Sequence, residues 1–411
     1  MKLLRILTFT SLFPNSVDPT HAVFVYQRCA HLARRTGNEV LVISPVPWFP
    51  RWLKTERWRA ASVLPAQEKI GELTVYHPRY FLVPKVSMLW HAVSMFLGSF
   101  QLALRLHRKA KIDCVDAHFV YPDGLAAVLL GKYLNVSVIV SARGTDINLF
   151  PSFRLIRPMI RWTLKRADGI IAVSAALKRN MVELGTPEEK ILVIANGVDA
   201  TRFHPVPPLT ARSKLNLPAN GKFFVSVGSL IPSKGHDLLV RAFSNVVQGR
   251  SDLRLYIVGD GPLRGALEGL VKDLELTESV HILRKRPNEE LQLWYCAANA
   301  SCLASSREGW PNVVTESLAC GTPVVATAVG GIPEIVHSEE LGILVERTVE
   351  SMAAGMRRAL ETSWNREAIS RQTLARTWDM VAAEVEEVLQ AGVKGGAADR
   401  RKFQASENLL I

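Results

Sequence analysis

Two glutamates eight residues apart lie in the stretch of sequence best suited to chemistry. Glu308 follows an apolar run with the pattern of a strand, and Glu316 lies near the start of a helix that Asn312 is expected to cap. Backbone N–H groups at such a start, here those of Asn312 and Val313, can hold a diphosphate. Glu308 would then lie where a sugar attached to the diphosphate sits, and Glu316 could accept two ribose hydroxyls. Alternatively, the helix dipole alone favours two solvated glutamates there.

A second stretch, VGSLIPSKGH at residues 227–236, has the composition of an anion-binding loop. Gly228 ends a predicted strand and Ser229 follows it, while Lys234 comes just before a helix expected to start near Asp237. A lysine before a helix N-terminus suits an anion, because the cation and the helix dipole act in the same direction. A solvated lysine in a turn is the alternative, and spacing alone does not separate the two.

Two further features have ordinary structural explanations. Gly259, Gly261 and Gly265 imitate a dinucleotide fingerprint, but their spacing is one residue too long, which favours a tight turn between strand and helix. His118 ends an apolar run and could contact a ligand. Considered alone, it is better explained as a buried, hydrogen-bonded histidine.

These loops need strands to position them, and the sequence supplies two sets. Short apolar runs alternate with helical patterns, which predicts parallel sheets with covered faces. The first set lies at 3–11, 39–46, 114–120, 137–144 and 169–174, and the second at 223–230, 254–261, 280–283, 300–306 and 322–329. We predict an α/β protein with two doubly wound, Rossmann-like domains facing a cleft, because open sheets bind ligands beyond the carboxyl ends of their strands.

The predicted domain plan has five parts. A Pro-rich, aperiodic stretch separates the two sheets, and a helical stretch follows the second one. The parts are an N-terminal domain at 1–200, a linker at 201–221, a second domain at 222–375, a helix at 376–391 that crosses back, and a flexible tail at 392–411.

The positive charge is confined to the first half of the chain. The 411 residues carry 50 Lys and Arg against 38 Asp and Glu, a net charge of +12, and residues 1–200 hold 26 basic and 14 acidic side chains of these. The first domain is therefore expected to face an anionic partner. Helix-turn-helix, zinc and aromatic-platform patterns are missing from the sequence, which argues against nucleic acid. Five cysteines at unrelated spacings fit a reducing cytosol.

Two segments bear on membranes. Residues 47–59 (PWFPRWLKTERWR) place tryptophans among basic residues, which predicts docking on an anionic membrane; a surface loop with packed tryptophans is the alternative. Residues 86–104 lack Asp, Glu, Lys and Arg, but their polar residues recur at helical spacing. This stripe predicts a buried or membrane-lying helix and not a spanning one. We expect a cytoplasmic protein that is peripheral to the membrane.

Taken together, these motifs resemble glycosyltransferase family four, whose members are retaining enzymes with the two-domain GT-B fold. The matching segments run in the family's order over roughly residues 3–390. They are His118 within DAHFVYPDG, ARGTDIN at 142–148, NGVD at 196–199 with Phe203 and Pro205, the loop from Gly228 to Gly235, VGDGP at 258–262, and the spacing of Glu308 and Glu316 followed by CGTPVVAT and GGIPEIV.

The resemblance implies a role for each matching residue. Lys234 would contact the donor diphosphate, and Glu316 would bind the nucleotide ribose. Glu308 would orient the donor sugar or stabilise its cationic transition state, and His118 would touch that sugar from the first domain. Residues 283–286, which include Arg286, would flank the base.

Two positions depart from the family pattern. Ser229 stands where the family often has arginine, so one phosphate contact is lost or supplied by Arg286 or Arg307. Ala22 stands where a glycine is usual in the loop after the first strand, which puts the close approach of an acceptor in doubt. The donor site is not affected by the second departure.

The resulting prediction is a metal-independent hexosyltransferase without a cofactor. The chain has no D-x-D motif, so Lys234 and the helix start at Asn312 would stabilise the leaving group. The donor would be a UDP- or GDP-sugar, and the acceptor a lipid-linked or saccharide hydroxyl in polysaccharide or glycolipid synthesis. Two alternatives stay open: a sugar-nucleotide epimerase of the same architecture, and a non-catalytic, basic, lipid-associated binding protein.

Overall fold

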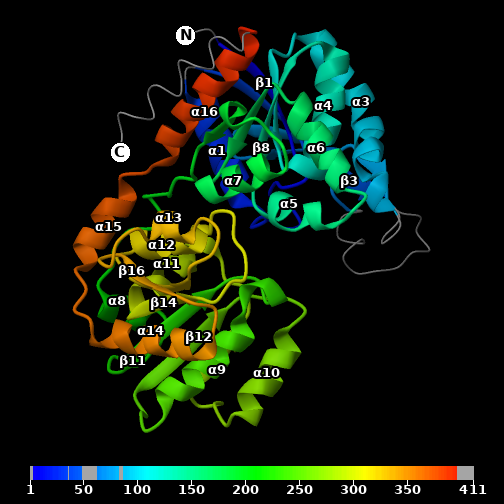
Figure 1. Ribbon diagram of the computed structural model, residues 1–411. Helices are drawn as coiled ribbons and strands as arrows, with labels where there is room; N and C mark the ends of the chain where they lie inside the picture. The colour runs from blue at the N-terminus through cyan, green and yellow to red at the C-terminus, as the bar shows by residue number, and fades with distance from the viewer. Residues whose placement is uncertain (1–2, 36, 49–62, 83–86, 396–411) are drawn as a thin grey trace. The chain divides into compact units, whose positions relative to one another are not determined.

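The computed structural model describes residues 3–35, 37–48, 63–82 and 87–395. The chain forms two compact units, one made of Met1–Asn196 with Trp378–Ile411 and the other of Gly197–Thr377 (Figure 1). Each unit has a mostly parallel sheet covered by helices, so the prediction of two Rossmann-like α/β domains is confirmed. The chain passes between the units at two points that lie together, because Val198 and Thr377 form a β-bridge.

The N-terminal unit contains an eight-stranded sheet in the order β10-β9-β8-β7-β1-β2-β5-β4. Neighbouring strands are parallel, except that β4 runs antiparallel to β5 at one edge. The central strands are buried along nearly their whole length, as apolar strands with two covered faces must be. The strands are β1 (Arg5–Phe9), β2 (Glu39–Ile43), β4 (Gln67–Ile70), β5 (Leu73–Tyr76), β7 (Cys114–His118), β8 (Ser137–Ala142), β9 (Gly169–Ala172) and β10 (Ile191–Val193), with β3 (Val46–Trp48) and β6 (Arg79–Phe81) in a separate parallel pair.

Helices of this unit connect the strands and cover the sheet. They are α1 (Val23–Arg34), α3 (His91–Lys109), α4 (Leu125–Leu134), α5 (Thr145–Asn148), α6 (Arg157–Arg166), α7 (Ala175–Glu183) and α16 (Trp378–Val393). Figure 1 shows α16, in red, alongside α1. Its apolar residues join those of β1 and α1 in one core, and its buried Glu386 accepts a hydrogen bond from Asn38 Nδ2 (2.9 Å). The last long helix therefore belongs to the N-terminal unit.

The C-terminal unit contains a six-stranded, fully parallel sheet in the order β13-β12-β11-β14-β15-β16. Five of these strands were predicted, and β16 was not. The strands are β11 (Lys222–Val227), β12 (Leu253–Val258), β13 (Val280–Leu283), β14 (Ala300–Leu303), β15 (Val324–Thr327) and β16 (Gly342–Val345). The helices are α8 (Pro208–Lys214), α9 (His236–Val247), α10 (Arg264–Asp273), α11 (Asn288–Ala297), α12 (Asn312–Ala319), α13 (Ile332–Ile335), α14 (Val349–Glu361) and α15 (Arg366–Leu374).

The stretch predicted as a linker, 201–221, differs from that expectation because it is packed into the C-terminal unit. It contains α8, which begins with Pro208, a residue compatible with the first turn of a helix. Arg212 of α8 is buried, donates to the carbonyl of Ala297 (3.1 Å) and lies over the ring of Phe223. Proline content alone therefore misidentified this segment as a linker.

The charge-free stretch at 86–104 forms most of α3, which starts at His91. The first part of its polar stripe faces β6: Ser94 Oγ donates to the carbonyl of Phe81, and a Cβ at Gly98 would lie 2.5 Å from the carbonyl oxygen of Arg79. Further along the stripe, Gln101 and Arg105 are exposed. In the part of the chain that the structure describes, no helix is both long enough and apolar enough to cross a bilayer.

Candidate active site

An ion pair joins the two residues expected to act on the donor. Lys234 Nζ lies 2.5 Å from Glu308 Oε1, and Ser305 Oγ donates to the same oxygen at 2.7 Å. Lys234 ends the loop after β11, and Glu308 lies in the loop after β14. Because β11 and β14 are adjacent parallel strands, their carboxyl-end loops meet at one edge of the sheet. The lysine side chain is 23% exposed and the glutamate 10%, so the pair is accessible but only partly solvated.

Two glycines hold the backbone of these loops in close contact. Gly235, directly after Lys234, has φ +66°, and a Cβ there would lie 2.2 Å from the carbonyl oxygen of Ala304. Gly330, in the GGIPEIV segment, has φ +57°, and a Cβ there would lie 2.0 Å from the carbonyl oxygen of Glu308. Only glycine satisfies both the positive φ and the close approach. The two glycines therefore fix the backbone positions from which the side chains of Lys234 and Glu308 extend.

The VGDGP segment supports the same loops from the side. A Cβ on Gly259 would lie 1.9 Å from the carbonyl oxygen of Gly228. Arg264 ties this turn to β13, donating to the carbonyls of Gly259 (2.7 Å) and Leu283 (3.0 Å). This is the tight strand-to-helix turn that the glycine spacing predicts. Sequence reasoning missed Arg264, although it follows the motif by two residues.

Helix α12 begins at Asn312, the residue predicted to cap it. The capping position is Pro311, and no side chain caps the helix. Asn312 and Val313 form the first turn, where the carbonyl of Asn312 accepts from Thr315 Oγ1 (2.8 Å). A proline before the helix supplies the extended backbone of a cap without a donor. Anion binding at this helix start stays a prediction.

Glu316 lies one turn into α12, partly buried against α11. Its Oε2 accepts a hydrogen bond from the hydroxyl of Tyr295, at 3.1 Å. Burial raises the pKa of Glu316 to about 7, and the bond from Tyr295 only partly opposes this. Tyr295 is fully buried, so its hydroxyl holds Oε2 in a fixed orientation. The other oxygen, Oε1, has no hydrogen-bond partner among the described residues. A carboxylate held in this way can accept hydroxyl groups from a ligand.

Arg286 and Arg307, which were expected to replace the arginine missing at Ser229, have different surroundings in the structure. Ser229 is exposed in the loop after β11. Arg286 Nε lies 3.6 Å from Glu290 Oε1 at the start of α11, and Arg307 is exposed beside Glu308. Arg286 is therefore engaged with a helix of its own unit, while Arg307 remains accessible next to the Lys234 pair. Within the described residues, no group of three His, Cys, Asp or Glu could hold a metal ion.

His236 is a residue that sequence reasoning missed. It starts α9 and is 2% exposed, and its Nδ1 lies 3.4 Å from Ser226 Oγ. A Cβ on Gly228 would lie 3.8 Å from Nε2, which has no hydrogen-bond partner in the described part of the chain. Burial, followed by the charge of Lys234, lowers its pKa to about 4, so the ring is neutral. The signal in the sequence was a histidine directly after Lys234–Gly235.

His118 belongs to a buried network in the N-terminal unit. Its Nε2 lies 3.1 Å from Asp116 Oδ2, and its Nδ1 lies 2.5 Å from Arg143 Nη2. A guanidinium can only donate, so Nδ1 accepts and Nε2–H donates to Asp116. Burial lowers the pKa of His118 to about 3, which keeps the ring neutral. Both ring nitrogens are thus used within the unit, and contact of His118 with a donor sugar stays a prediction.

The network is completed by a buried arginine that the sequence did not reveal. Arg28 of α1 donates to Asp116 Oδ1 (2.7 Å) and to Ser141 Oγ (2.8 Å). Burial alone would raise the pKa of Asp116, but Arg28 and its other neighbours lower it to about 2. Arg143 extends the network by donating to Asn196 Oδ1 (3.1 Å). These contacts join α1 to the carboxyl ends of β7 and β8.

Comparison with known proteins gives the family. The model described as "Glycosyltransferase Family 4" matches residues 21–202, and the one described as "Glycosyl transferases group 1" matches residues 209–376. The putative teichuronic acid biosynthesis glycosyltransferase TuaC of Bacillus subtilis is 27% identical over 404 residues, 96% of this chain and 95% of that one. The D-inositol 3-phosphate glycosyltransferase of Thermobispora bispora is 31% identical over 237 residues, 54% of this chain and 55% of that one.

Solved structures agree on the fold. Sucrose-phosphate synthase from Thermosynechococcus elongatus superposes with a TM-score of 0.78 at 20% identity, covering 95% of this chain and 99% of that one. Anabaena HepE in complex with UDP has a TM-score of 0.70 at 19% identity, covering 94% and 100%. With matches over both units, the chain belongs to glycosyltransferase family four and has the GT-B fold.

Proposed function

We propose that this glycosyltransferase transfers a hexose from a UDP- or GDP-sugar to a hydroxyl acceptor, with retention of configuration. The observation that carries the proposal is the ion pair between Lys234 and Glu308 at the carboxyl ends of β11 and β14. The donor diphosphate replaces the carboxylate as the partner of Lys234. Glu308 is then released to face the sugar, whose transition state carries positive charge.

Positive charge from the protein stabilises the leaving diphosphate as the glycosidic bond breaks. Lys234 supplies a full charge, and the first turn of α12, at Asn312 and Val313, supplies a partial one. Gly228 and Ser229 let the phosphates approach the backbone. This arrangement needs no divalent metal, so activity is expected to survive an excess of EDTA. Loss of activity in EDTA with recovery on adding magnesium would contradict this part of the proposal.

Glu316 binds the ribose of the donor. Tyr295 holds one carboxylate oxygen at 3.1 Å, which turns the group into a fixed acceptor for the 2′- and 3′-hydroxyls. Arg286 and the end of β13 flank the base. The His118 network lies at the carboxyl ends of the strands in the N-terminal unit, and contact of His118 with the donor sugar is an expectation from the family resemblance.

The acceptor is a saccharide or a lipid-linked saccharide. TuaC, which matches along nearly the whole chain, is named for teichuronic acid biosynthesis, and this supports a role in polysaccharide synthesis. The N-terminal unit takes the acceptor at the cytoplasmic face of an anionic membrane. The residues of the N-terminal unit include 30 basic and 19 acidic side chains. The C-terminal unit is nearly neutral, with 20 basic and 19 acidic side chains.

A described apolar surface supports docking on that membrane. Trp48 of β3 and Phe81 of β6 are both exposed, with ring centroids 6.3 Å apart, and Trp90, just before α3, and Leu97 of α3 are exposed as well. We call these four residues the apolar patch. Large apolar side chains near basic ones suit the headgroup layer. Of the basic segment predicted to anchor the protein, 47–59, residues 49–59 lie outside the described residues.

Two assays in sequence separate the proposal from its alternatives. A thermal-shift screen of UDP, GDP and ADP identifies the base, because a ligand that binds only the folded state raises its stability. HepE, which was solved with UDP, makes UDP the first nucleotide to try. Release of nucleotide from the matching sugar is then followed with and without acceptor saccharides. Release that depends on an acceptor supports transfer, isomerisation of the donor without release indicates an epimerase, and binding without either reaction indicates a binding protein.

A further inference from the structure

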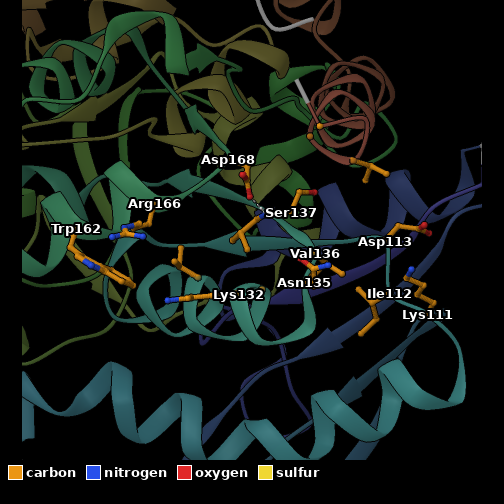
Figure 2. Close-up of a pocket in the computed structure, with 16 residues that line it drawn as sticks. Lys111, Ile112, Asp113, Lys132, Asn135, Val136, Ser137, Trp162, Arg166 and Asp168 are labelled. Carbon is orange, nitrogen blue, oxygen red and sulfur yellow. Dashed lines mark hydrogen bonds between the residues drawn. The ribbon is translucent and has the colours of Figure 1, made fainter. Parts of the chain in front are cut away.

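A hollow in the N-terminal unit lies at the end of the sheet opposite the His118 network. It has a volume of about 650 Å³, within the usual range for small-molecule pockets, and its lining includes the first residues of β8 and those just before β7 (Figure 2). Helices α4, α6 and α16 end beside it, at Leu134, Arg166 and Val393. His118 lies at the other end of β7, so this pocket is separate from the active-site edge.

Three cationic side chains and two aspartates line the pocket, and no salt bridge joins them. Lys111, Lys132 and Arg166 have neither a salt bridge nor a hydrogen bond to any residue that the structure describes. The two acids of the lining are engaged with the backbone: Asp113 accepts from the N–H of Arg5 and Asp168 from that of Val138, each at 2.8 Å. Lys132 and Arg166 lie in the last turns of α4 and α6, where the helix dipole favours a positive charge. Their charged groups nevertheless have no carboxylate partner among the described residues.

The pocket also offers an aromatic face and polar groups. Trp162 is 36% exposed, and the guanidinium of Arg166 lies 5.8 Å from its ring centroid. Figure 2 shows Lys132, Arg166 and Trp162 towards one end of the pocket and Lys111 and Asp113 towards the other, with Ser137 between them. The hydroxyl of Ser137 is buried and makes no hydrogen bond with the described residues. A ligand here would meet a ring surface, a hydroxyl and separated positive charges.

We propose that this pocket binds an anionic saccharide, a sugar chain that carries carboxylate groups. Carboxylates pair with the separated cations, a sugar ring lies on Trp162, and sugar hydroxyls contact Ser137 and the acids. The cations lie towards both ends of the pocket, which suits carboxylates spaced along a sugar chain better than the adjacent phosphates of a nucleoside diphosphate. The inference goes beyond the proposed function and does not depend on the donor site.

Calorimetry with a tetrasaccharide of galacturonic acid tests the proposal, with cellotetraose as the uncharged probe of equal length. At low ionic strength the wild type binds the acidic chain, and the neutral chain binds at least about tenfold more weakly. Lys132→Glu together with Arg166→Glu lowers the affinity by roughly tenfold or more, and Trp162→Ala lowers it as well. Arg166→Glu is also measured alone, and Lys165→Glu is its matched control, because it makes the same single charge change on the same helix outside the pocket.

Three outcomes overturn the proposal. They are no binding of the acidic chain to the wild type, equal binding of the neutral chain, and a Lys165→Glu variant as weak as the pocket variants, which would indicate general charge attraction. Thermal unfolding of each variant separates lost binding from lost folding. Lys234→Ala keeps the saccharide affinity while losing turnover, so failure of this site and failure of the proposed function are told apart.

Discussion

The ammonium group of Lys234 and the carboxylate of Glu308 lie 2.5 Å apart although 74 residues separate them in the chain. Adjacent parallel strands bring their loops together, and glycines at 235 and 330 bring the two loop backbones into contact with neighbouring carbonyls. The pair holds the ammonium and the carboxylate in fixed positions at the carboxyl ends of the two strands. In the proposed function, the donor diphosphate displaces the carboxylate from the lysine.

Removing either member of this pair should abolish most transfer. Lys234→Ala loses the charge that stabilises the leaving diphosphate, and Glu308→Ala loses the group that faces the cationic sugar. We expect each to lower kcat by roughly two orders of magnitude or more. Nucleotide release in the presence of acceptor measures the effect. Lys272→Ala, which removes an exposed lysine of α10 in the same unit, should leave kcat unchanged. Turnover near wild type in both site variants would mean that the pair is structural.

Donor binding should depend on the ionisation of Glu316. Burial raises its pKa to about 7, and only the carboxylate can accept two ribose hydroxyls. UDP affinity is therefore expected to rise with pH and to level off above about 7. Glu316→Gln should bind more weakly and lose this part of the pH dependence. Calorimetry with UDP between about pH 5.5 and 8.5 measures both proteins, and the variant also corrects for ionisation of the nucleotide itself. An unchanged dissociation constant in the variant would assign Glu316 a structural role.

The same raised pKa predicts an effect on stability. The folded protein holds a proton on Glu316 that the unfolded chain releases near pH 4.5, so stability falls as the pH rises from there to about 7. Glu316→Gln removes this loss, and its stability relative to wild type should therefore be higher at pH 8 than at pH 4. Denaturant unfolding at the two pH values gives the comparison. A constant difference between the two proteins would contradict a raised pKa.

Much of the candidate active site could be predicted from the sequence, because the local strand, turn and helix patterns agree with the tertiary structure. The apolar runs at 223–230 and 300–306 contain β11 and β14, and Lys234, Glu308 and Glu316 lie where loops and a helix start were expected. Such agreement is typical near a ligand site at the carboxyl edge of a parallel sheet, since strand, turn and helix follow each other closely. These residues could be placed before any coordinates existed.

The remaining parts depend on contacts that no local pattern encodes. Arg28 reads as an exposed helix residue, yet it is buried against Asp116, 88 residues away. His236 is buried next to Gly228, a contact that no local pattern predicts. The prolines of residues 201–221 favoured a linker, although Pro208 is the first residue of α8. Strand β4 has the polar sequence QEKI and so lacks the apolar run that identifies the other strands, and the short apolar strand β16 was not predicted.

Gly330 should tolerate no side chain. Gly330→Ala introduces a Cβ that would lie 2.0 Å from the carbonyl oxygen of Glu308, at φ +57°, so the loop must move. The left-handed conformation alone costs alanine about 1–2 kcal/mol. We expect lower stability and, in the protein that still folds, a large loss of kcat, because Glu308 is displaced. Gly269→Ala in α10 is the control: nothing lies within 4 Å of its added Cβ, and stability should rise by about 0.5–1 kcal/mol.

Membrane docking should require the apolar patch. Vesicles of phosphatidylglycerol are expected to sediment the wild type at low salt, and vesicles of phosphatidylcholine much less. Trp90→Ser together with Leu97→Ser should reduce sedimentation without unfolding, since both side chains are mostly exposed. Salt should reduce it further, because each lysine or arginine near an anionic surface contributes about 1 kcal/mol before screening.

The matched control for this surface is Leu209→Ser, which removes an equally exposed leucine from α8 of the nearly neutral C-terminal unit. It should sediment like the wild type, because docking depends on a unit that has both apolar side chains and excess positive charge. Equal sedimentation of the Trp90 and Leu97 double variant would mean that charge alone attracts the protein to vesicles. A wild type that ignores phosphatidylglycerol at low salt would exclude the membrane and make a soluble saccharide the acceptor.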